Sequence, residues 1–208
     1  MKKFDTKSLV ILALLAGLLV LMALTPLGYL RFGTISITLN MIPVAIGAIA
    51  LGPIGGAILG CVFGITSFMQ CFGADPFGTM LTSYSVFGSF IVCIVARMLA
   101  GLITGIIYKM ISSKTNVSSF ALYPVMGLTA SLLNTVLFMT SLMTIFGKTP
   151  EIVAMRNGAN ILAFMCAFVG INAVFEIIAC TLVTSAVAAA LNKSHLISSE
   201  PRSCFSKA

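Results

Sequence analysis

The sequence predicts an all-α polytopic membrane protein, a bundle of six transmembrane helices. Of its 208 residues, 59% are hydrophobic and only 8% are charged, whereas about a quarter of the residues in soluble domains are charged. The mean hydropathy is +1.13, and long uncharged runs separate the few charges. This composition excludes a folded cytosolic enzyme. It also excludes a disordered chain, because disorder requires low hydrophobicity and high charge.

The gaps between charges place the helices, since a helix that crosses a bilayer needs about 20 apolar residues. The uncharged stretch from Phe32 to Ala74 is long enough for two helices, and Gly52-Pro53 divides it, because proline lacks an amide hydrogen and suits the first turn of a new helix. We expect Asp75–Gly78 to form a turn and Gly147–Arg156 a polar loop. The six expected helices are Leu9–Leu24, Ile35–Leu51, Ile54–Phe72, Val86–Met110, Phe120–Ile145 and Gly158–Leu191.

Six helices put both termini on one side of the membrane, and the distribution of basic residues decides which side. With a cytoplasmic N-terminus, eight lie inside (Lys2, Lys3, Lys7, Lys109, Lys114, Lys193, Arg202 and Lys207) and three outside (Arg31, Lys148 and Arg156). We therefore expect an N-in/C-in protein of the plasma membrane. Residues 1–7 form a cytoplasmic N-terminus, residues 8–191 the membrane domain and residues 192–208 a cytoplasmic tail.

Small residues indicate where helices approach closely. Glycines recur every fourth residue from Gly52 to Gly64, a spacing that lets two backbones pack tightly in lipid. Gly101 and Gly105 repeat this spacing on the next helix. The pair Ala13 and Gly17 places small residues on the first helix, where they suit either packing inside the bundle or contact with a partner protein.

Two charges lie inside apolar runs, Arg97 in the fourth expected helix and Glu176 in the sixth. Either charge alone costs about 2.5–3.5 kcal/mol on insertion scales. Their opposite signs are consistent with an ion pair between the two helices. Both residues could equally line a ligand site, and the sequence leaves these two interpretations open.

Four asparagines add polar groups to the helices: Asn40, Asn134, Asn160 and Asn172. An amide in a bilayer needs a partner, which is either another helix or a ligand with hydroxyl and amide groups. Asn172 and Glu176 are four residues apart and share one helix face. Together with Arg97, these side chains predict a polar site in the outer half of the bundle.

The sequence contains no motif that indicates a catalytic site, a metal site or a nucleotide-binding site. His195, the one histidine, lies in the polar tail, and neither H-E-x-x-H nor a Walker loop occurs. The six cysteines stand singly, without the spacing of a metal or redox motif. The basic residues are scattered rather than clustered, which argues against nucleic acid as a partner. We expect no catalytic residue, metal or cofactor.

Several of these segments resemble one family, the S components of energy-coupling factor (ECF) vitamin transporters. The family pattern IP-x-x-IGA-x-x-LGP-x-x-GA-x-x-G is matched from Ile42-Pro43 to Gly60, within the longer similar stretch Gly28–Ile65. Weaker similarities follow at Ala96–Gly101, at Leu133-Asn134-Thr135 and from Asn172 to Glu176. Six helices and a length near 200 residues also agree, and the resemblance covers residues 8–191.

The resemblance implies a membrane subunit that captures a vitamin from outside and delivers it by toppling within the bilayer. Its partners would be a transmembrane coupling protein and two ATPase subunits, in agreement with the missing Walker loop. The family's A-x-x-x-A contact for the coupling protein corresponds here to Ala13-x-x-x-Gly17. The lipid bilayer and a small vitamin complete the expected partners.

The sequence around Leu27–Tyr29, Leu51–Pro53 and Ala96-Arg97 is most similar to that of the pantothenate-type S components. Pantothenate carries a carboxylate, an amide and two hydroxyls. Its carboxylate suits Arg97 or the loop cation Arg31, and the asparagines suit its polar groups. Riboflavin, pyridoxine, folate or a related precursor remain alternatives, as does a self-sufficient ion-coupled carrier that uses Glu176.

Overall fold

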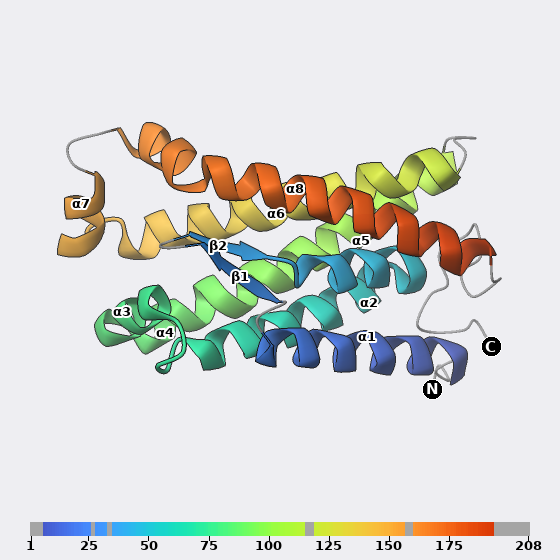
Figure 1. The fold of residues 1–208 in the computed structure, drawn as a ribbon, viewed down its shortest axis with the longest axis horizontal. Coiled ribbons are helices and arrows are strands. Elements are labelled where there is room, and N and C mark those ends of the chain that lie inside the picture. The colour runs from blue at the N-terminus through green and yellow to red at the C-terminus, as the bar shows by residue number, and fades with distance from the viewer. Residues whose placement is uncertain (1–5, 26–27, 33–34, 115–118, 157–159, 194–208) are drawn as a thin grey trace.

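The computed structural model describes residues 6–25, 28–32, 35–114, 119–156 and 160–193, which form a bundle of long helices lying roughly along one axis (Figure 1). The long helices are α1 (Thr6–Leu24), α2 (Met41–Gln70), α5 (Ala96–Lys114), α6 (Ser119–Phe146) and α8 (Ile161–Lys193). The short elements are β1 (Tyr29–Phe32), β2 (Ile35–Thr38), α3 (Pro76–Tyr84), α4 (Val86–Phe90), the π-helical turn η1 (Ile91–Val95) and α7 (Pro150–Arg156).

The bundle has two distinct ends. The start of α1 and the end of α8 lie at one end, which we call the terminal end (Figure 1). The short helices α3, α4 and α7 lie at the other, which we call the loop end. The helices α5 and α8 both run from the loop end toward the terminal end, and α6 runs the opposite way.

Five helical stretches are long and apolar enough to cross a membrane, among them Val86–Ser113, in which α4, η1 and α5 follow one another without a break. Large apolar side chains are exposed along these helices, for example Leu14 and Leu21 on α1 and Leu182 on α8. A water-soluble protein rarely exposes so much contiguous apolar surface. The predicted class of a multi-pass membrane protein is confirmed.

Helix α2 consists of two segments that fold back on each other. Gly52 between them has φ 74° and ψ −163°, a left-handed backbone that favours glycine, and Pro53 begins the second segment. Leu59 packs against Gly47, twelve residues earlier, whereas these positions would be about 18 Å apart in a straight helix. The predicted division at Gly52-Pro53 is therefore correct, although the described part of the chain gives five membrane-crossing stretches rather than six.

The expected helix from Ile35 begins later, at Met41. Residues 35–38 instead form strand β2, which pairs antiparallel with β1, so that Tyr29 lies opposite Thr38 and Phe32 opposite Ile35. The physical reason is the β-branched character of Ile35, Ile37 and Thr38, which favours an extended backbone. The fold is thus nearly all helical, with one two-stranded hairpin.

Short helices also replace two segments that were expected to be turn or loop. Asp75 caps α3, because its Oδ2 accepts the Gly78 amide at 2.8 Å and Pro76 occupies the first turn. Residues 150–156 form α7, which begins with a proline in the same way. The expected helix from Phe120 begins at Ser119, and the expected helix from Gly158 to Leu191 is α8, from Ile161 to Lys193.

The predicted glycine stripe packs inside the bundle, against α5 and η1. A Cβ atom on Gly56 would fall on the Gly101 backbone, and one on Gly60 would fall on the Arg97 carbonyl. Gly64 faces η1 and Gly105 faces Pro53 in the same manner. Close backbone approach of this kind lets dispersion forces hold two helices together where water exclusion cannot.

Replacing Gly60 with leucine should separate α2 from α5, because a side chain at this position has only backbone to displace. We expect the free energy of unfolding to fall by about 1–3 kcal/mol, the cost typical of an overpacked core. The matched control is Gly17→Leu, since nothing lies within 4 Å of a Cβ at Gly17. Thermal unfolding in detergent, followed by circular dichroism, should show a lower midpoint for the first variant only. Equal midpoints would contradict this packing.

One side-chain contact joins two of the short helices at the loop end. The hydroxyl of Tyr84, the last residue of α3, donates to Oε2 of Glu151 in the first turn of α7. Both side chains are accessible to solvent. The hydrogen bond to the carboxylate raises the pKa of Tyr84 above its ordinary value, because ionisation of the phenol would remove the donated proton and place two negative charges together.

The Tyr84 contact should therefore be intact below about pH 10, the pKa of an unperturbed tyrosine, and be lost as the pH rises through the raised pKa. An ultraviolet titration of wild type minus Tyr84→Phe isolates the titration of this one phenol. In Glu151→Gln the charge is gone, so the midpoint should fall toward the ordinary tyrosine value. An unchanged midpoint in that variant would refute the contact.

Candidate functional site

The guanidinium of Arg97 lies in the interior of the bundle, with only 7% of the residue exposed. It lies 4.7 Å from the ring centre of Phe63 on α2 and 5.2 Å from that of Phe138 on α6. Its Nη1 donates to the carbonyls of Val92 at 3.3 Å and Cys93 at 3.1 Å. These aromatic faces and carbonyl dipoles stabilise the cation without neutralising it.

The turn η1 supplies those carbonyls. The Ala96 amide bonds to the Ile91 carbonyl, five residues earlier instead of four, so the helix is wider immediately before Arg97. Such π-turns within α-helices are often found at functional sites. Here the turn brings two carbonyl oxygens within reach of the guanidinium on the same helix.

Glu176 on α8 forms the second part of the site, together with two residues of α6. The Asn134 amide donates to Glu176 Oε1 at 3.3 Å, and both residues are only 7% exposed. The Ser131 hydroxyl lies beside the Glu176 carboxylate but outside hydrogen-bond geometry. Asn134 Oδ1 likewise has no hydrogen-bond partner among the described residues. A polar ligand would find unused groups here.

Arg97 and Glu176 lie at similar depths but do not form an ion pair. Each is 17 residues from the terminal end of its helix, at Lys114 or Lys193, or about 25 Å at 1.5 Å per residue. Their charges are near enough to interact. Yet Arg97 donates to backbone carbonyls and Glu176 accepts from Asn134, and within the described residues no carboxylate reaches the guanidinium. The ion-pair interpretation is therefore wrong for this state.

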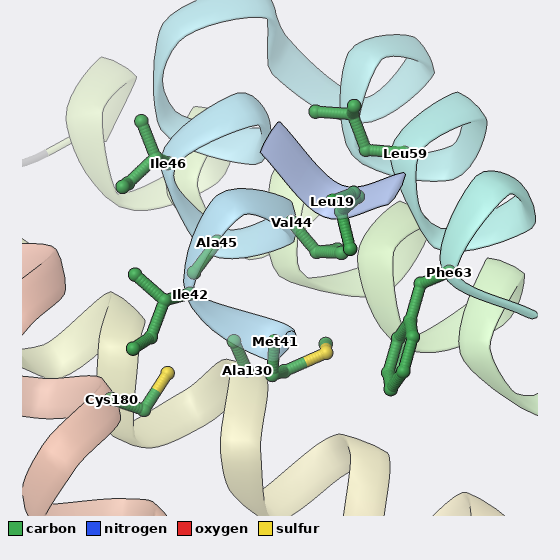
Figure 2. Close-up of a cluster of buried hydrophobic side chains, with 11 residues drawn as sticks. Leu19, Met41, Ile42, Val44, Ala45, Ile46, Leu59, Phe63, Ala130 and Cys180 are labelled. Carbon is green, nitrogen blue, oxygen red and sulfur yellow. The ribbon is translucent and has the colours of Figure 1, made fainter. Parts of the chain in front are cut away.

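An apolar layer closes the site on its terminal side. One helical turn toward the terminal end from Arg97, Asn134 and Glu176 lie Ala100, Ala130 and Cys180, all fully or almost fully buried. They pack in one cluster with residues of α1 and α2, and Figure 2 shows Met41 and Ile42 beside Ala130 and Cys180. Arg97, Asn134 and Glu176 thus form a polar layer, and the apolar layer borders it on the terminal side. A hydrated solute could not cross the apolar layer without rearrangement of the helices.

Asn40 lies at the start of α2, immediately on the loop side of Met41. The residue is fully buried, and neither its amide nitrogen nor its amide oxygen has a hydrogen-bond partner among the described residues. It occupies the N-cap position of α2 but forms no capping hydrogen bond. A buried amide without partners costs roughly 1–3 kcal/mol, and a ligand could offset this cost.

The structure does not bring every predicted residue to this site. Asn160 is exposed just before α8, 16 residues and about 24 Å of helix from Glu176. Arg31 lies on β1 and Asn172 on α8, but their side chains fall outside the described residues. The structure adds Phe63, Phe138 and Ser131 to the site. Helical spacing could have indicated Ser131 and Phe138, which lie three and four residues from Asn134 on the same face.

The predicted partner contact on α1 lies at the surface. Ala13 and Gly17 are both exposed, and the space beside Gly17 is open. Exposed leucines flank the pair, among them Leu14 and Leu21. The opposite face of α1 carries Leu12, Leu15, Ala16 and Leu19, which pack on the core of the bundle.

No cluster of three metal-ligating side chains occurs among the residues that the structure describes. The described site is therefore one cation, one carboxylate, amides and a hydroxyl, together with aromatic rings. This set can bind and orient a small polar molecule, and an anionic group on that molecule would have the Arg97 guanidinium as its counterion.

Comparison with known proteins agrees with this architecture. Residues 7–188 match the family described as ECF transporter, substrate-specific component. A pantothenic acid transporter PanT of Lactococcus lactis subsp. cremoris (strain MG1363) is 28% identical over 207 residues, covering 93% of this chain and 97% of the relative. A pantothenate transporter PanT of Leuconostoc mesenteroides subsp. mesenteroides is 30% identical over 199 residues, covering 90% of this chain and 93% of the relative.

The family match spans nearly all of the membrane bundle and includes the glycine stripe, Arg97, Asn134 and Glu176. It confirms the resemblance seen in the sequence, including the similarity to the pantothenate type. The family description and the names of both relatives are those of transporters. This chain belongs to the family of substrate-specific components of ECF transporters.

Proposed function

We propose that this protein is the pantothenate-capturing subunit of an ECF transporter. The observation that carries the proposal is the Arg97 guanidinium, which is buried between two aromatic rings and has no carboxylate partner among the described residues. An uncompensated cation in a membrane protein is costly, and the carboxylate of pantothenate would provide its missing counterion. Two relatives named as pantothenate transporters support this choice of vitamin.

The other groups of the ligand match the rest of the polar layer. The amide and hydroxyls of pantothenate can donate to Glu176 and to Asn134 Oδ1, and Asn40 offers both an unused donor and an unused acceptor. Phe63 and Phe138 would exclude water beside the carboxylate and strengthen its attraction to Arg97. The proposed ligand residues are thus Arg97, Asn134, Glu176 and Asn40. Arg31, Asn160 and Asn172 remain predictions.

We propose six membrane passes, counting the two segments of α2 separately, with both termini in the cytoplasm. The distribution of basic residues along the sequence supports this orientation, because with a cytoplasmic N-terminus eight of them fall inside and three outside. The loop end, with its hairpin and short helices, would then face outward and admit the vitamin. The apolar layer below the site would keep the bound vitamin from leaking inward until partners act.

A coupling protein would dock on α1 at Ala13 and Gly17, and two ATPase subunits would supply the energy. The support is the exposure of both small residues and of the leucines around them, together with the family membership. A small-xxx-small surface lets another helix approach closely in lipid.

The proposed function predicts that this protein binds pantothenate on its own but transports it only together with its partners. Purified protein in detergent should bind radiolabelled pantothenate without ATP, and pyridoxine or riboflavin should not displace it. In vesicles the protein alone should not accumulate pantothenate, and accumulation should require the coupling protein, the ATPases and ATP. Accumulation by the protein alone, lost in Glu176→Gln, would instead establish an ion-coupled carrier. Absence of binding would reject the proposal.

Arg97→Ala should weaken pantothenate binding roughly 10- to 100-fold. A hydrogen bond to a charged group is worth about 1.5–3 kcal/mol, and each 1.4 kcal/mol changes the dissociation constant about tenfold. Isothermal titration calorimetry measures the change, and thermal unfolding verifies that the variant folds. The control is Lys109→Ala, which removes an exposed cation of the same helix. Equal affinities for folded Arg97→Ala and wild type would contradict the role of Arg97.

Gly17→Leu should abolish uptake while leaving pantothenate affinity unchanged, because its side chain would extend from the exposed face of α1 toward the partner. Uptake is measured in vesicles that contain the full complex, and affinity with the isolated protein. Leu21→Ala, on the same exposed side, is the control for a general change in the α1 surface and should retain uptake. Full uptake with Gly17→Leu would exclude this face as the docking site.

A further inference from the structure

Two buried cysteines lie in contact near the loop end. Cys71 follows directly after α2, and Cys93 lies in η1, and their sulfur atoms are 3.7 Å apart. They are only 3% and 4% exposed, and Ile94, Phe68 and Cys61 pack around them. Of the four cysteines whose surroundings the structure describes, only these two have sulfur atoms in contact.

The pair lies where three segments meet. The Cys71 carbonyl accepts the Thr82 hydroxyl of α3 at 3.1 Å, and Gly78 of α3 packs against the Cys71 sulfur. On the other side, the Cys93 carbonyl accepts Arg97 Nη1 at 3.1 Å. A bond between the two sulfurs would therefore connect the end of α2, and the helix α3 held on it, to the turn that supports Arg97.

We propose that Cys71 and Cys93 form an oxidation site, which closes to a disulfide on reaction with a small neutral peroxide. Hydrogen peroxide is close to water in size and polarity, and the turn that follows Cys71 is exposed at Phe72, Gly73 and Ala74. A local opening of this turn is enough to admit it. Larger oxidants would be excluded by the burial of both thiols.

The chemistry balances with one peroxide per pair. The sulfur of one cysteine attacks a peroxide oxygen, the O–O bond breaks, and a sulfenic acid and one water form. The second sulfur then attacks the sulfenic sulfur, the S–S bond forms, and the hydroxyl leaves with the remaining thiol proton as a second water. The two thiols together lose two electrons, and the peroxide gains them.

Closure requires little movement. The sulfurs must approach from 3.7 Å to about 2.05 Å, which side-chain rotation and a small shift of η1 can supply. The covalent link would restrict opening of the loop end, because Cys71 and Cys93 could no longer separate in the unfolded or partly opened chain. This consequence concerns the bundle itself and does not depend on which molecule the protein binds.

The test uses the full-length wild-type protein in detergent, reduced and then treated with hydrogen peroxide. Mass spectrometry under non-reducing conditions should show a loss of two hydrogens and a cross-linked peptide pair containing Cys71 and Cys93. Cys71→Ala and Cys93→Ala should not yield this cross-link, whereas Cys61→Ala, altered in the same cluster, should yield it as wild type does. Separate sulfinic acids on the two cysteines, or persistence of both free thiols, would overturn the proposal.

A second measurement tests the proposed link between the segments. Oxidised wild type should unfold at a temperature roughly 5–10 °C higher than reduced wild type, and dithiothreitol should reverse the shift. Hydrogen–deuterium exchange should slow in α3 and η1 on oxidation. Peroxide should produce neither change in Cys93→Ala. An unchanged or lower unfolding temperature in the cross-linked protein would overturn the proposed stabilisation.

Discussion

The close contact between the backbones of α2 and α5 is the constraint on which the rest of the structure depends. At Gly60 the two helices are so near that a Cβ atom would meet the carbonyl of Arg97 itself. The contact fixes how α5 is rotated, and so directs the Arg97 side chain into the bundle rather than toward lipid. Phe63, three residues after Gly60, is then placed against the guanidinium. Packing and site thus share the same residues.

Electrostatics explains why such a site would capture a solute, as proposed, instead of conducting it. A guanidinium in a medium of low polarity attracts an anion far more strongly than it would in water. The aromatic rings and carbonyl oxygens around Arg97 lower the energetic cost of burying its charge but do not neutralise that charge. The layer of Ala100, Ala130 and Cys180 then blocks the way onward. In the proposed function, this closed layer would retain the bound solute, and its release would require energy from the partner subunits.

Much of the fold could be predicted from the sequence, because the strongest signals act locally. Gaps between charges located the helices, Gly52-Pro53 marked the reversal inside α2, and the four-residue glycine spacing indicated which helix faces pack closely, although it did not say which helices pair. The hairpin was missed because Ile35–Thr38 is short and uncharged, and such a run fits a helix start as well as a strand. The cap of α3 was visible as Asp75-Pro76, but a turn uses the same residues.

The site was predicted only in part, for a different reason. Composition indicates that Arg97, Asn134 and Glu176 are buried, but the partner of each depends on how the helices rotate about their axes. The widened turn η1 has no marker in Ile91–Val95, which is a plain apolar run, yet it supplies the carbonyls that hold Arg97 away from the carboxylate.

The most direct test of this account compares pantothenate with pantothenol, in which an alcohol replaces the carboxylate, on wild type and on Arg97→Gln. If Arg97 is the counterion of the ligand, wild type should bind pantothenate at least about tenfold more tightly than pantothenol, a difference of about 1.4 kcal/mol. Arg97→Gln should bind both equally, because it has lost the charge that distinguishes them. A preference for pantothenate that persists undiminished in folded Arg97→Gln would contradict the account.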